Sequence, residues 1–205
     1  MKATIKRKKS IFWFGILLLL FLIALNFITD ELKYFGLDEV DFGRYWDIKW
    51  WLIGHLLGGI AALILGPFQF WTEFRNKYLR LHRLMGKVYL IAILIASFSS
   101  VYMAWTHAIE IHLAWAVALQ TLGLVWFCTI FMAYRAIRKR IIEQHKEWMI
   151  RSYVVTFAFV AFRWLNNLPA VIELGSFAER APTIVWLVWV IPLFITEIIL
   201  QWNRK

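Results

Sequence analysis

Four histidines carry the clearest chemical signal in the sequence. His55, His82, His112 and His145 are spread over the apolar part of the chain, and a fifth, His107, lies between two apolar runs. Imidazole is one of the ligands by which proteins hold haem iron. A histidine at the end of a membrane helix is also an ordinary interfacial residue, and a glycine there also serves helix packing. The spacing of the four histidines indicates whether they are haem ligands or interfacial residues.

Two of the histidines have a glycine eleven residues later, which places both residues on one helical face. Gly66 follows His55 at this distance, and Gly123 follows His112 in the same way. At about 100° per residue, positions eleven apart lie within about 20° of each other around a helix. A missing side chain on that face leaves room for a flat group.

The pattern therefore predicts two b-type haems, each held by two histidines from different helices. The outer haem lies between His55 and His112, and the inner haem between His82 and His145.

Buried charges and an amide complete the predicted site. Arg163 lies eighteen residues after His145, a whole number of turns, so it shares the inward face at the outer level. An unpaired arginine at that depth is costly, and an outer haem propionate would be a suitable partner. The inner level offers further residues for the cofactor, namely Arg151, Arg83 and Gln69. Snorkelling to the interface is an equal alternative for the two arginines.

Apolar runs of about 20 residues position these side chains. The 205 residues are 61% hydrophobic, and runs of this length cross a hydrocarbon core as helices. We predict an all-α polytopic membrane protein, a single transmembrane domain over 1–205 with a central four-helix bundle at about 49–165. The six expected spans are 11–29, 49–71, 82–105, 111–134, 147–165 and 183–202.

The charge distribution indicates topology rather than nucleic-acid binding. The net charge is +10, yet 16 Lys/Arg lie in the segments 1–10, 72–83, 135–147 and 203–205. The segments 30–49, 105–111 and 166–182 carry four, beside nine acids. Basic loops stay in the cytoplasm. We therefore expect both termini in the cytoplasm and no nucleic-acid partner. The lone Cys128 excludes an internal disulfide and is expected to be buried.

Short motifs resemble an uncharacterised bacterial family of multi-spanning membrane proteins, a domain of unknown function. The resemblance covers roughly residues 50–165 and rests on Gly66-Pro67-Phe68-Gln69, on Leu81-His82-Arg83 with Gly86 and Tyr89, and on His145, Trp148-Met149 and Arg151-Ser152. This family implies a bacterial cytoplasmic membrane and no established activity.

The histidine layout is also similar to cytochrome b561, in which two haems b sit between helices at opposite faces. By position, His55 and His112 would match the outer pair, and His82 and His145 the inner pair. His112 departs from that pattern, because it lies nearer its helix end than His55 does. An ascorbate-site motif is absent from the sequence, so that substrate is not carried over.

Three classes of function follow. The first is a di-haem b electron carrier or oxidoreductase that passes electrons between a quinol or small reductant and an acceptor. The second is a transporter, and the third a structural or assembly subunit, both without haem. Lipid is the expected environment, and a homo-oligomer or a larger membrane complex stays open.

Overall fold

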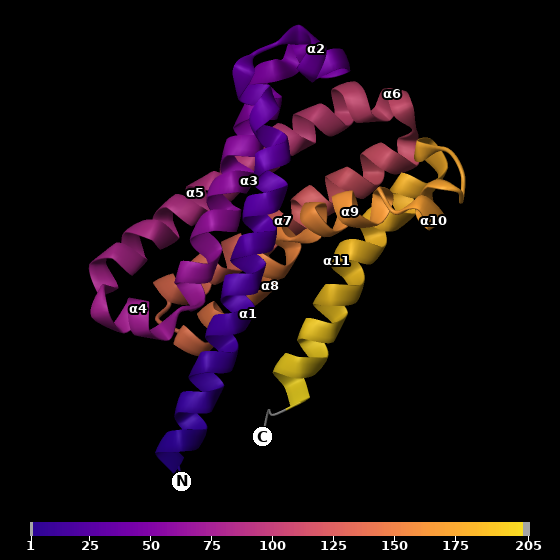
Figure 1. Ribbon diagram of the computed structural model, residues 1–205. Coiled ribbons are helices and arrows are strands. Elements are labelled where there is room, and N and C mark those ends of the chain that lie inside the picture. The colour runs from indigo at the N-terminus through magenta and orange to yellow at the C-terminus, as the bar shows by residue number, and fades with distance from the viewer. Residues whose placement is uncertain (1, 203–205) are drawn as a thin grey trace.

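The computed structural model describes residues 2–202, with side chains from residue 15 onward, and its regular elements are all helical in that range. This confirms the all-α prediction. The long helices are α1 (Lys2–Glu31), α3 (Lys49–Phe70), α5 (Leu79–Met103), α7 (Leu113–Arg138) and α11 (Phe177–Trp202) (Figure 1). Between them lie η1 (Leu32–Gly36), α2 (Glu39–Phe42), η2 (Gly43–Ile48), α4 (Thr72–Lys77), η3 (Ala104–Ala108), α6 (Ile109–Ile111), α8 (Ile142–Thr156), α9 (Ala158–Asn166) and α10 (Pro169–Ile172).

Five stretches of the described chain are long and apolar enough to cross a membrane. They are Gly15–Gly36, Glu39–Phe70, Leu79–Ile111, Leu113–Arg138 and Phe177–Trp202. Each contains most of one predicted span. The remaining predicted span, 147–165, is not among these five: it falls on two shorter helices, α8 and α9, which meet at Phe157.

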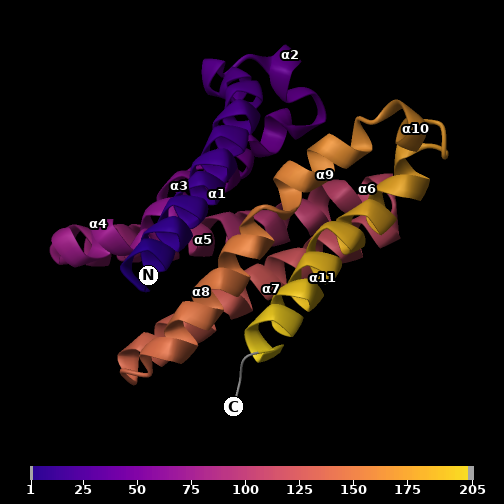
Figure 2. The ribbon, with the colours of Figure 1, turned by 60° about the horizontal axis from the view of Figure 1, so that its bottom comes forward.

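The break between α8 and α9 has a local cause. The Thr156 hydroxyl donates to the Ser152 carbonyl oxygen over 2.9 Å, a bond that competes with the helical ladder and bends helices. The Phe157 amide then bonds to the Tyr153 and Val154 carbonyls, both at 3.2 Å, instead of to one carbonyl in regular geometry. The bend directs α9 toward α11 (Figure 2).

Small residues set the closest contact in the bundle, between α3 and α5. A Cβ on Gly58 would lie 2.3 Å from the Ala92 carbonyl oxygen and 2.8 Å from the Ala96 Cβ. The two backbones therefore approach more closely than side chains would permit, as is typical of helix pairs in membranes. Further contacts of α5 with α7 and of α7 with α8 complete a four-helix core, as predicted, with α1 against α3 and α11 against α7 to α9.

The two ends of the bundle differ in charge. The first and last described residues lie at the same end as α4 and the α7–α8 turn, and we call this the basic end (Figure 1). Residues 30–48, α6 and α10 lie at the other end, the acidic end (Figures 1 and 2). The last predicted basic segment, 203–205, lies outside the described residues.

Two local expectations were wrong. The segment 105–111 was expected to be a loop, but it is helical, because α5 continues through the π-helical turn η3 into α6. Cys128 was expected to be buried, but it is exposed on α7, on the outside of the bundle.

Candidate functional site

A cavity of about 240 Å³ opens inside the acidic half of the bundle. Its walls come from α1, α3, α5, α7, α8 and α9, and residues of η1, η2 and η3 line its acidic end. Three of the predicted site residues line it, namely His55, Gly123 and Arg163. Gly59, one turn after His55, lines it as well. Most other lining residues are apolar or aromatic. Concave, mainly apolar pockets with a few polar groups are the usual form of a small-molecule or cofactor site.

The cavity histidine, His55, is fixed by the neighbouring helix. Its Nδ1 lies 3.0 Å from the Ala96 carbonyl oxygen, and since a carbonyl only accepts, Nδ1 carries the proton. The Nε2 atom is therefore the unprotonated nitrogen, with its lone pair available. Trp126 and Phe159 pack against the ring, with centroids 6.4 and 6.1 Å away. A backbone bond of this kind to the far nitrogen is how proteins orient histidine ligands and bases.

The glycines divide into two groups. Gly59 and Gly123 line the cavity, and a Cβ on Gly59 would meet nothing within 4 Å. Gly66 instead makes room for Tyr153, because a Cβ there would lie 1.9 Å from a ring carbon of that tyrosine. The Tyr153 hydroxyl donates to the Leu63 carbonyl over 3.1 Å, so this face is filled by protein.

Arg163 lines the cavity and forms an ion pair with Glu31 at the end of α1. The Glu31 side chain is only 3% exposed, whereas 41% of the Arg163 side chain is exposed. The sequence predicted a buried anionic partner for Arg163 and took a haem propionate for it. Glu31 was missed because it was assigned to the acidic segment 30–49, although it lies only two residues beyond the first predicted span.

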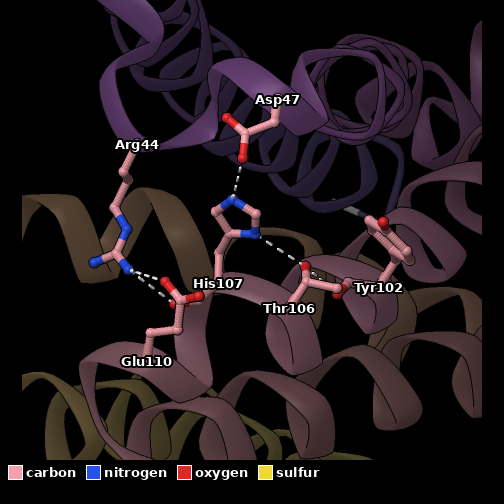
Figure 3. Close-up of polar contacts among 6 residues, drawn as sticks. All are labelled: Arg44, Asp47, Tyr102, Thr106, His107 and Glu110. Atoms are coloured by element: carbon pink, nitrogen blue, oxygen red, sulfur yellow. Dashed lines mark hydrogen bonds and ion pairs between the residues drawn. The ribbon is translucent and has the colours of Figure 1, made fainter.

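The two predicted outer ligands do not meet in this cavity. His112 is exposed, is not among the cavity residues, and caps α7: its Nδ1 accepts from the Ala114 amide over 3.1 Å. Its proton is therefore on Nε2 in the neutral ring. The nearby His107 faces Asp47 at 3.9 Å (Figure 3). It also stacks on Tyr45, which itself lines the cavity. Arg44 and Glu110, 2.9 Å apart, form the adjacent contact between the same segments (Figure 3).

Both predicted inner ligands lie at the basic end, His82 in the first turn of α5 and His145 in the first turn of α8. The His145 Nδ1 donates to the Ala133 carbonyl over 3.0 Å, so Nε2 is again the free nitrogen. The His82 Nδ1 is buried and has no hydrogen-bond partner.

Gln69 also lies near the basic end, and its amide is only partly satisfied. Its Nε2 is buried without a hydrogen-bond partner. Its Oε1 would be 3.1 Å from a Cβ on Gly86, so the amide lies against α5 one turn beyond His82. Buried polar atoms without partners are rare in proteins and require an explanation.

The remaining predicted arginines have different environments. Arg151 is paired with Glu197 at 2.5 Å and with Glu147 at 3.6 Å. Arg83 is exposed, in agreement with the snorkelling alternative. Within residues 15–202, no group of three or more His, Cys, Asp or Glu is placed to hold a metal ion. A bis-histidine haem needs only two such ligands from the chain.

A family model described as "Predicted membrane protein (DUF2306)" matches residues 52–200. The chain belongs to this family. The DUF2306 match covers α3 to α11, and so includes all four histidines of the predicted sites. No match was found among the curated proteins or among the solved structures. The unknown-function family expected from the motifs is thus confirmed, while the cytochrome b561 likeness stays a prediction.

Proposed function

We propose that this DUF2306 protein is a haem-b membrane protein that transfers electrons, with His82 and His145 as the axial ligands. The single observation that carries the proposal is the placement of the inner pair. The two histidines lie in the first turns of different helices at the basic end, and one of them, His145, is already oriented by the Ala133 carbonyl.

The nitrogen atoms without hydrogen-bond partners at the basic end support haem binding there. Iron is bound by a deprotonated imidazole nitrogen, and His145 offers Nε2 in that form. The unpartnered His82 Nδ1 and Gln69 Nε2 mark the same region as incompletely satisfied by protein alone. A bound group that gives these atoms partners would remove that cost.

When bound, haem supplies one-electron chemistry, cycling between ferric and ferrous iron. The chain contributes the positions of the ligands. The bond from His145 to Ala133 holds the ring orientation and raises its basicity as a ligand. Helix α7 packs against both α5 and α8, the two helices that carry these histidines.

We also propose a bacterial cytoplasmic membrane with both termini in the cytoplasm. The support is the 16-to-4 distribution of basic residues together with the common end at which the first and last described residues lie (Figure 1). With this orientation the inner haem faces the cytoplasm.

Haem content of histidine variants tests the proposal. We expect the purified protein to contain bound haem with a low-spin spectrum, and His82→Ala and His145→Ala each to remove it. His107→Ala is the matched control and should keep the haem, because His107 lies at the acidic end. Full haem retention in both inner variants would refute the assignment of ligands.

A further inference from the structure

The cavity contains a polar group with a free acceptor. His55 lines it, with Nδ1 committed to Ala96 and Nε2 left as an acceptor. A ligand that donates a hydrogen bond to an imidazole would complete the site.

The walls indicate a flat apolar ligand. Phe27, Trp126 and Phe159 line the cavity from α1, α7 and α9, and most of the remaining lining is aliphatic. Aromatic side chains bind planar rings through stacked or edge-on contacts. Because the cavity lies between membrane-spanning helices, lipid is the natural source of such a ligand.

The charges indicate that the ligand is neutral. Arg163 is the cavity cation, and its charge is already matched by Glu31. A carboxylate or phosphate entering beside this pair would face the buried Glu31 carboxylate. Two negative charges close together repel strongly in a medium of low dielectric constant.

We propose that this cavity binds the ring of a membrane quinone and its quinol. A quinol hydroxyl donates to His55 Nε2. Quinol binding in the cavity does not depend on the proposed haem function. The redox role of the ligand, as the electron partner of the inner haem, rests on the proposed function.

Binding of a short-chain benzoquinol and a short-chain naphthoquinol to the purified full-length protein, followed by calorimetry in detergent, tests this inference. His55→Phe removes the acceptor and keeps an aromatic ring, and we expect roughly 3- to 10-fold weaker binding, the usual worth of one hydrogen bond. His112→Asn is the control, because His112 is exposed and does not line the cavity, and asparagine keeps a helix-capping acceptor. It should leave the affinity unchanged.

Gly59→Leu is a second variant that does not depend on hydrogen bonding. A side chain at Gly59 meets no atom within 4 Å at Cβ, so leucine should enter the cavity and abolish binding while the fold is retained. Binding that survives this substitution, or that is absent from the unmodified protein, would overturn the inference. Loss of haem in His55→Ala would also overturn it, by assigning the cavity to a second haem.

The two proposals fail separately. Quinol binding sensitive to His55 in a protein without haem would keep the cavity assignment and refute the proposed function. Haem sensitive to His82 and His145 in a protein that binds neither quinol would do the reverse.

Discussion

The ion pair between Glu31 and Arg163 joins α1 to α9, and its two members should contribute unequally to stability. Glu31 is almost completely buried, with 3% of its side chain exposed, whereas Arg163 retains 41% exposure. Replacing Arg163 by glutamine leaves a carboxylate in the protein interior. Replacing Glu31 by glutamine leaves an arginine that reaches the interface by snorkelling.

The magnitudes follow from these exposures. Removing one partner of a buried pair costs about 3–5 kcal/mol, because the remaining charge stays unpaired. A buried carboxylate that loses its partner relieves part of this cost by taking up a proton. Arg163→Gln should therefore lie at the lower end, about 3 kcal/mol. Glu31→Gln should cost about 1 kcal/mol, close to an exposed pair plus a lost hydrogen bond. The double variant should cost less than the sum of the two, by about 1–2 kcal/mol.

Reversible unfolding in mixed micelles, followed by tryptophan fluorescence, measures these free energies. A cycle of the two single variants and the double variant gives the coupling directly. Equal costs for the two single variants, or a larger cost for Glu31→Gln, would refute the argument from burial. Additive costs would show that the two side chains do not interact.

Three further predictions follow from the packing and the charges. Gly66→Ala should destabilise the protein by about 2–3 kcal/mol because its Cβ enters the ring of Tyr153, whereas Gly59→Ala should be neutral or slightly stabilising; unfolding free energies compare the two. Arg151→Gln should cost about 2 kcal/mol and Glu197→Gln about 1 kcal/mol in the same assay, because Arg151 is 13% exposed and also meets a second carboxylate. Reporter fusions should give cytoplasmic signal at the basic end and external signal at the acidic end, and the reverse would contradict the assigned orientation; the informative positions are 10, 78, 140 and 205 against 40 and 175.

The spans were predictable from the sequence because run length and hydropathy alone determine them. Five of the six expected spans correspond to single long helices. The sixth, 147–165, falls on α8 and α9 instead of on one long apolar helix, and the break at Phe157 depends on the side-chain bond from Thr156 to Ser152, which periodicity does not reveal.

The candidate site was predictable only in part. His55 and Gly123 both line the cavity, although His112, from which the position of Gly123 was predicted, does not. The same rule gave Gly66 to the cofactor, whereas Tyr153 occupies that face. Phase describes one helix and says nothing about which side chain a neighbouring helix supplies.

The helix start explains the different position of His112. Its backbone is extended, with φ −170° and ψ 140°, so it lies outside the regular helix for which the eleven-residue rule holds. The position of His112 at the start of an apolar run could have indicated this from the sequence. A histidine there should be considered as an N-cap before it is considered as a ligand.

The haem content of the purified protein tests the central claim most directly. A pyridine haemochrome assay on protein from haem-replete cells should give close to one haem per chain, reduced to near zero by His82→Ala or His145→Ala and unchanged by His107→Ala. A colourless protein under these conditions, or haem that persists when both inner histidines are replaced, would contradict the account.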